Sequence, residues 1–140
     1  MYVYSIRIKL LSPDDEGYMT PKERGFDTCQ LVSRHWRISY DVPGRDQPRV
    51  EEVRGDGIIG KYPKLFEGHA NNYEGERFGQ LQPMERVDGP FVYQSCTDGQ
   101  FQGEMSGSLQ FQPGSISDAS GDVFDAEVKS FPLQYPDFYY

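Results

Sequence analysis

The sequence predicts an all-β fold, an antiparallel sandwich of about seven short strands. The first reason is composition: the 140 residues include 15 Gly and 10 Pro but only three Ala, so turn formers are common and helix formers scarce. The second is that apolar and polar residues alternate in several short segments separated by turn residues. Ten Tyr and nine Phe supply apolar area for one modest core. We therefore expect a single domain over residues 1–140.

The first strand is predicted over residues 2–10. Its odd positions, such as Ser5, Arg7 and Lys9, are mostly polar, and its even positions are all apolar. This period of two is typical of a strand with one buried face. The buried face is expected to hold Tyr2, Tyr4, Ile6, Ile8 and Leu10. Residues 12–27, which are polar and contain Gly and Pro, are predicted as a long connection.

The second strand is predicted over residues 29–40, with a change of phase inside it. Cys29 and Leu31 place the apolar face at odd positions, whereas Trp36 and the apolar residues after it stand at even positions. One residue must be absorbed between them, so we expect a bulge or a strand break at Ser33–His35. Trp36, the only tryptophan, is expected to be buried between the sheets.

The later elements are predicted from the same alternation. A turn over residues 41–48 and a short strand over residues 50–54 lead into a glycine segment. Residues 67–90 are polar and rich in Gly with no period, so we expect a long surface loop. Three further strands are expected around residues 91–96, 104–111 and 123–133, followed by an aromatic tail over residues 134–140.

Charge and cysteine content exclude several classes of protein. Lys and Arg number 14 against 22 Asp and Glu, a net charge of −8, which disfavours binding to nucleic acid. No apolar run reaches the roughly 20 residues that span a bilayer, and no leader is recognisable. We expect a soluble, unexported chain of the cytoplasm or nucleus, without membrane partners. Cys29 and Cys96 are then expected to be reduced thiols.

No catalytic residue, cofactor or metal ligand can be assigned from the sequence. His35 and His69, the only histidines, have no further ligand at the spacing of a metal motif. Asp14–Glu16 lacks the alternating ligands of a calcium loop, so we interpret it as a solvated acidic turn. Neither Cys nor any Ser lies in a nucleophile elbow. The sequence therefore favours a non-enzymatic role.

The segment Gly55-Asp-Gly-Ile-Ile-Gly60 matches the G-x-G-x-x-G pattern of dinucleotide-binding loops. In those loops the third glycine opens a helix that holds the pyrophosphate. Here Lys61-Tyr-Pro63 follows directly, and proline disfavours helical angles in the residue before it. We interpret the segment as a turn that glycine permits, and keep Gly55, Gly57 and Gly60 as the alternative, an anion site.

Five segments in order resemble the ApaG domain family, and together they span nearly the whole chain. They are Cys29–Ile38 with Arg-His-Trp, Val50–Gly60, Phe91–Cys96, Gly103–Ser108 and Phe124–Leu133. The resemblance implies an immunoglobulin-like or fibronectin type III-like sandwich. The segments Phe111–Ser115 and Phe131–Phe138 are most similar to the ApaG domain at the C-terminus of plant F-box proteins. A strand that begins at residue 2 agrees with such an excised domain.

The resemblance implies a protein-interaction domain, which selects substrates for a ubiquitin ligase when it is joined to an F-box. Residues 67–90 depart most from the family pattern and carry Tyr73, Arg77, Phe78 and Met84, residue types enriched at interface centres. We expect a protein partner to dock there, unless these side chains pack back on the sandwich. The rival hypotheses are a small-ligand or anion binder, and a stand-alone ApaG protein linked to cobalt and magnesium tolerance.

Overall fold

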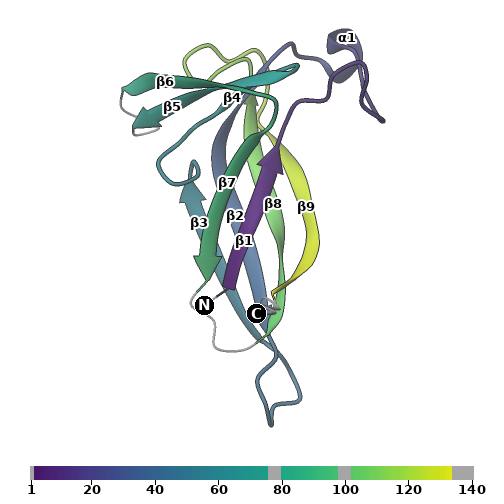
Figure 1. Cartoon of the computed structure of the whole chain (residues 1–140), viewed down its shortest axis with the longest axis vertical. Helices are drawn as coiled ribbons and strands as arrows, with labels where there is room; N and C mark the ends of the chain where they lie inside the picture. Colours follow the sequence, from purple (N-terminus) through teal and green to yellow (C-terminus); the bar gives the residue numbers. More distant parts are fainter. Residues whose placement is uncertain (1, 76–79, 98–101, 134–140) are drawn as a thin grey trace, which may run out of the picture.

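A computed structural model describes residues 2–75, 80–97 and 102–133, so the predicted tail over residues 134–140 lies outside the described residues. The described residues form nine strands and one short helix (Figure 1). The elements are β1 (Tyr2–Ile8), α1 (Pro21–Arg24), β2 (Cys29–Tyr40), β3 (Arg49–Asp56), β4 (Lys64–Phe66), β5 (His69–Gly75), β6 (Leu81–Asp88), β7 (Phe91–Thr97), β8 (Gly103–Pro113) and β9 (Phe124–Leu133). The predicted antiparallel β-sandwich is confirmed.

The two sheets of the sandwich are very unequal in size. One contains only β1 and β7, and the other has the order β6-β5-β4-β2-β8-β9, with β3 also paired to β2. Strands β3 and β4 share one edge of β2: β4 pairs with Cys29 and Gln30, and β3 with Ser33–Tyr40. All of these strand pairs are antiparallel. The pair β1 and β7 therefore covers only part of the larger sheet.

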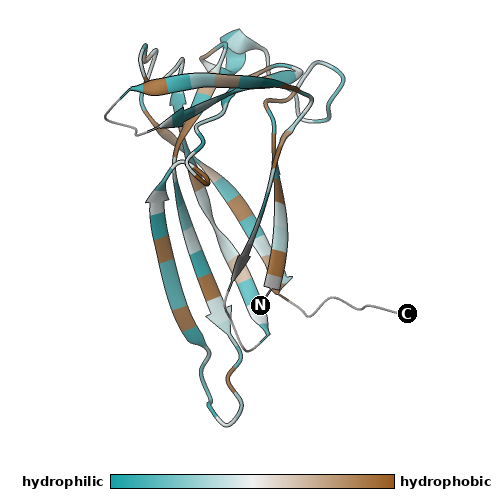
Figure 2. Ribbon diagram, turned by 60° about the vertical axis from the view of Figure 1, so that its left-hand side comes forward, coloured by the Kyte–Doolittle hydropathy of each residue, from teal (hydrophilic) through white to brown (hydrophobic). Residues whose placement is uncertain are grey.

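The core lies between the two sheets and follows the alternation seen in the sequence (Figure 2). In β1, Ile8 is buried and Ile6 is half-buried, whereas Ser5 and Arg7 are exposed, as predicted. Trp36 is only 2% exposed, which confirms its predicted burial. Its ring packs edge-on against Tyr4, with the two ring centroids 6.3 Å apart.

Strand β2 is continuous and carries its bulge one residue earlier than predicted. Its register with β8 shifts between Leu31 and Ser33, so the extra residue is Val32 and not one of Ser33–His35. The shift moves the core-facing residues from odd to even positions, as the sequence required. Val32 is itself buried, at 2% exposure. The predicted position was too late because Leu31 and Val32 are both apolar and both buried, so the alternation does not reveal which residue is the extra one.

The expectation of a long loop over residues 67–90 was wrong. Strands β5 and β6 pair with each other, and β5 also pairs with β4. The hydrophobic alternation is missing because β6 lies at the edge of its sheet and most of its side chains are exposed. In β5, one of the buried side chains is Asn72, a polar residue that no hydrophobicity pattern would place inside. Solvated edge strands therefore have the composition of a loop.

The connection between β1 and β2 contains a short helix that the sequence analysis did not anticipate. Thr20 and Glu23 form a reciprocal capping box, and Pro21 occupies the first turn. Gly25 ends the helix in the left-handed conformation, at φ 92°.

Among the described residues, no helix has the length and apolar character needed to cross a membrane.

Candidate interaction surface

The β5–β6 hairpin carries the predicted docking residues that the structure describes. Tyr73 lies in β5 opposite Pro83 of β6, and Met84 follows Pro83, so Tyr73 and Met84 stand on neighbouring strands of one hairpin. The hairpin extends across one end of the sandwich, at the top of Figure 1. The Met84 side chain is 46% exposed and Tyr73 is half-buried. Arg77 and Phe78 lie outside the described residues.

Polar contacts hold this hairpin onto the sandwich. The buried Asn72 donates from Nδ2 to Oε1 of Glu85, at 2.9 Å, across the two strands. This hydrogen bond lowers the pKa of the Glu85 carboxyl, and Lys61 lowers it further. The backbone amide of Tyr62 donates to the carbonyl of Tyr73 at 2.8 Å. The hairpin is therefore held to the rest of the described chain along β5, and β6 forms the edge of the sheet.

A second exposed apolar residue beside this hairpin was not identified from the sequence. Ile59 is 63% exposed and has a φ of 50°, a conformation that a β-branched residue rarely adopts. It lies in the turn from Ile58 to Lys61, and Lys61 forms a bridge to Glu74 of β5. The neighbouring Ile58 is buried, at 1% exposure. The sequence offers no signal that tells these two isoleucines apart, because only the turn determines which one faces solvent.

The glycine segment forms a tight turn and not the opening of a helix. The amide of Gly57 donates to the carbonyl of Val32, and Ile58 and Lys61 exchange two backbone hydrogen bonds of 2.9 and 2.8 Å. Gly57 and Gly60 both have positive φ, at 59° and 69°. Several amides that an anion would need already donate within the protein. The interpretation as a turn that glycine permits is therefore supported.

Gly55 has a different role from the other two glycines of the segment. It lies in β3 opposite Arg34, and a Cβ atom there would lie 2.7 Å from the nearer guanidinium nitrogen. The same guanidinium donates to the carbonyl of Gly57 at 2.8 Å. The guanidinium thus packs flat over a glycine and ties β2 to the turn. Because the Arg34 guanidinium donates to the backbone carbonyls of Asp56 and Gly57, we assign it a structural role.

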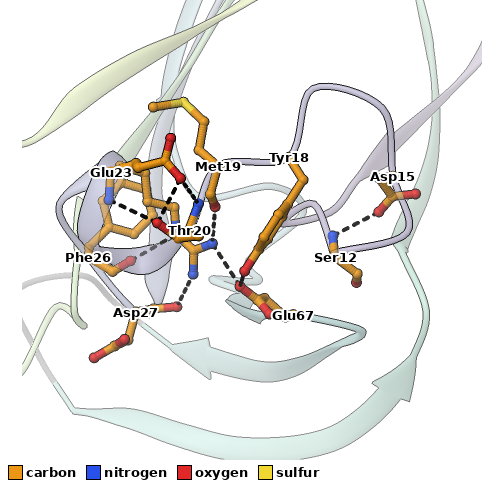
Figure 3. Close-up of polar contacts among 10 residues, drawn as sticks. Ser12, Asp15, Tyr18, Met19, Thr20, Glu23, Phe26, Asp27 and Glu67 are labelled. Carbon is orange, nitrogen blue, oxygen red and sulfur yellow. Dashed lines mark hydrogen bonds and ion pairs between the residues drawn. The ribbon is translucent and has the colours of Figure 1, made fainter.

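A cluster of polar contacts anchors the α1 connection to Glu67, in the turn between β4 and β5 (Figure 3). Arg24, whose side chain is only 8% exposed, donates to Oε1 of Glu67 at 2.8 Å and to the carbonyls of Met19, Phe26 and Asp27. The Tyr18 hydroxyl donates to the same carboxylate oxygen at 2.7 Å. The bond from Tyr18, followed by the one from Arg24, lowers the pKa of Glu67. Because these groups satisfy one another, the cluster is a structural anchor.

Cys29 and the two histidines have surroundings typical of structural residues in the part of the chain that the structure describes. Burial raises the pKa of the Cys29 thiol to about 12, so it is not a nucleophile at neutral pH. His35 lies 3.6 Å from one carboxylate, Glu52, and His69 stacks on the ring of Phe66. Across residues 2–75, 80–97 and 102–133, no three His, Cys, Asp or Glu residues group closely enough to hold a metal ion.

Comparison with known proteins finds relatives of two kinds. The family model of the ApaG domain matches residues 1–78. The F-box protein SKIP16 of Arabidopsis thaliana is 33% identical over 138 residues, which are 98% of this chain and 25% of that protein. Protein ApaG of Bradyrhizobium sp. (strain ORS 278) is 40% identical over 115 residues, 81% of this chain and 65% of that protein. Protein ApaG of Azotobacter vinelandii is 31% identical, covering 84% of this chain and 71% of that protein.

The extent of these matches differs between the two kinds of relative. The chain spans a quarter of the F-box protein and less than two thirds of the Bradyrhizobium protein. Among solved structures, the X-ray structure of the structural-genomics target SoR45 is similar, with a TM-score of 0.53 and 23% identity. That similarity covers 98% of this chain and 86% of the other, and it supports the fold alone.

Proposed function

Because this chain belongs to the ApaG domain family, we propose that it is a non-enzymatic protein–protein interaction domain that recognises a substrate or partner for an F-box ubiquitin-ligase subunit. The observation that carries the proposal is the 33% identity to an F-box protein over 98% of this chain. In that relative the matching part is a quarter of the protein, so the rest of the polypeptide is free to carry other functions.

The β5–β6 hairpin and the turn beside it supply a surface suited to this role. Met84 and Ile59 are apolar and exposed, and Tyr73 stands on the strand beside that of Met84. Aromatic residues and Met are enriched at interfaces, and a rigid surface loses little entropy on binding. Ile59 also holds a strained backbone conformation, a feature that clusters at functional sites. These observations support docking at this end of the sandwich.

The small-ligand alternative receives less support from the geometry. The amides of Gly57, Ile58 and Lys61 donate to backbone carbonyl oxygens, so an anion at these amides would have to compete with hydrogen bonds already made. An interaction domain requires no such rearrangement, because its contact residues are already exposed.

The test is a single substitution on the hairpin with a matched control. Replacing the whole hairpin would remove two strands, so Met84→Glu is the appropriate change, since it adds a charge to a side chain that is 46% exposed. Val50→Glu is the control, because Val50 is 42% exposed and pairs with Ser39 at the end of β2 remote from β4 and the hairpin. Both variants should keep the melting temperature of the parent chain, since neither position is in the core.

Each variant is used to capture partners from a lysate, and bound proteins are quantified by mass spectrometry. We expect a specific partner to be bound by the parent and Val50→Glu chains and lost by Met84→Glu. The chain is then joined to an F-box segment, and the half-life of that partner is measured in cells. We expect the fusion to shorten the half-life of the partner, and we expect the fusion that carries Met84→Glu to leave that half-life unchanged. Equal capture by both variants contradicts docking at the hairpin, and an unchanged half-life contradicts the ubiquitin-ligase role.

A further inference from the structure

The sandwich is open along the side where β1 faces β9. Since β1 and β7 cover only part of the larger sheet, the inner face of β9 remains incompletely buried: Phe124, Ala126 and Val128 are half-buried. On the neighbouring strand β8, Leu109 and Phe111 are 3% and 4% exposed. A groove of about 490 Å³ lies between β1 and β9, with these apolar side chains among its lining residues. A third strand of the small sheet would lie in this place.

The groove runs along the edge of β1. Every residue from Ser5 to Leu10 lines it, although successive side chains of a strand point to opposite faces. A groove can touch consecutive residues only if it follows the strand's backbone edge. Within the described residues strand β1 pairs with β7 alone, and only Leu10, beyond its end, is bridged to Glu67, so the other edge of Tyr2–Ile8 has unpaired backbone groups. The register of that pair is continuous from Tyr2 to Ile8, and β1 contains neither a proline nor a bulge that would protect the edge.

The charges at the border of the groove favour an acidic occupant. Lys9 is already bound to Asp15 at 2.8 Å, but Arg7 on β1 and Lys129 on β9 form no ion pair within the described part of the chain. Glu127 is the only carboxylate among the lining residues. This border is therefore cationic in a chain whose net charge is −8. A second copy of β1 would place Arg7 and Lys9 beside the same cations, and such like-charge neighbours are destabilising.

We propose that the groove binds an extended segment of a partner protein, which pairs with the free edge of β1 as an added strand. The proposal rests on the interaction function above and specifies the partner's chemistry. About six residues, or roughly 20 Å of extended chain, match the length of the groove. Every second side chain is apolar and packs on Phe124, Ala126 and Val128. The intervening side chains include Asp or Glu near Arg7 and Lys129. Backbone hydrogen bonds supply affinity, and the apolar positions supply specificity.

The first experiment selects random ten-residue peptides displayed on phage against the intact chain. We expect enriched peptides to alternate apolar residues with polar ones and to contain Asp or Glu at the intervening positions. Ala126→Arg, which places a long charged side chain in the groove, should weaken the best peptide at least about tenfold. Val50→Arg is the matched control on β3, where Val50 is 42% exposed and does not line the groove, and it should leave binding unchanged.

A second measurement needs no variant of the protein, so it remains valid if Ala126→Arg fails to fold. An added strand uses every second amide to bind its neighbour. N-methylation of one alternate set of peptide amides should abolish binding, and N-methylation of the other set should leave it intact. Repeating the selection on Arg7→Glu should shift the enriched peptides from acidic to basic residues.

Several outcomes overturn the proposal. One is that the selection enriches no peptide. Another is that N-methylation of either alternate set of peptide amides weakens binding equally. The third is that the Ala126→Arg variant folds and still binds the peptide. If Met84→Glu instead abolishes binding of the selected peptides, they bind at the hairpin and not in the groove, and the proposed interaction function is retained. A dimer of the chain that Ala126→Arg dissociates, seen by analytical ultracentrifugation, would show that the occupant is a second copy.

Discussion

Two alanine substitutions in the glycine segment separate backbone strain from steric crowding. Gly57 and Gly60 have similar positive φ, at 59° and 69°. A Cβ atom on Gly57 would lie 2.7 Å from the carbonyl oxygen of Lys61 and 3.0 Å from the ring of Tyr62, whereas a Cβ on Gly60 would meet nothing within 4 Å. Tyr62 is only 3% exposed, so its ring has little room to move. Gly60→Ala is therefore the matched control for Gly57→Ala.

The expected magnitudes follow from these distances. Placing alanine in the left-handed region costs about 1–2 kcal/mol, of which about 0.4–1 kcal/mol is offset by the lower entropy of the unfolded chain. Gly60→Ala should therefore lower the free energy of unfolding by about 1 kcal/mol. Gly57→Ala adds overpacking against a backbone oxygen and a buried ring, about 1–3 kcal/mol more. At about 3–5 °C for each kcal/mol, its melting temperature should fall several degrees further.

Thermal melts of the three chains measure this difference, with urea unfolding giving the free energies directly. The same melts with ATP or NAD test the anion-site alternative: a ligand at 100 times its dissociation constant adds about 2.7 kcal/mol. We expect no nucleotide-induced increase in the melting temperature. Equal stability of Gly57→Ala and Gly60→Ala would refute the crowding argument, and a reproducible increase with nucleotide would restore the anion site.

Two further predictions concern the core and the anchor. Trp36→Ala should lower the free energy of unfolding by about 3–5 kcal/mol, because a buried indole at 2% exposure is replaced by a cavity; native fluorescence typical of an exposed indole would contradict this. Glu67 has a pKa lowered by the hydrogen bonds from Tyr18 and Arg24, so its contribution to stability is present at neutral pH and is lost as the pH falls through that pKa. Glu67→Gln should flatten the decline in melting temperature between pH 5 and 3, and a decline as steep as the parent's would show that the carboxylate is not responsible.

The sequence alone determined the fold class and the faces of the core strands. In β1 the period of two identified the buried Ile8 and the exposed Arg7, because side chains of a strand alternate whatever the rest of the fold does. The change of phase in β2 likewise required a bulge near Trp36, and only its position was misjudged by one residue. The capping box of Thr20 and Glu23 was also readable from local spacing, although it was overlooked.

The tertiary structure alone decided where the candidate surfaces lie. The β5–β6 hairpin has no hydrophobic period, because β6 is solvated at a sheet edge and β5 buries the polar Asn72, whose Nδ2 donates to Glu85 across the hairpin. Which of Ile58 and Ile59 is exposed depends on one turn. The groove between β1 and β9 exists because two strands form one sheet and seven form the other. Strand partners are chosen by contacts between residues distant in the chain, and a local pattern of residues contains no information about which strand lies beside it.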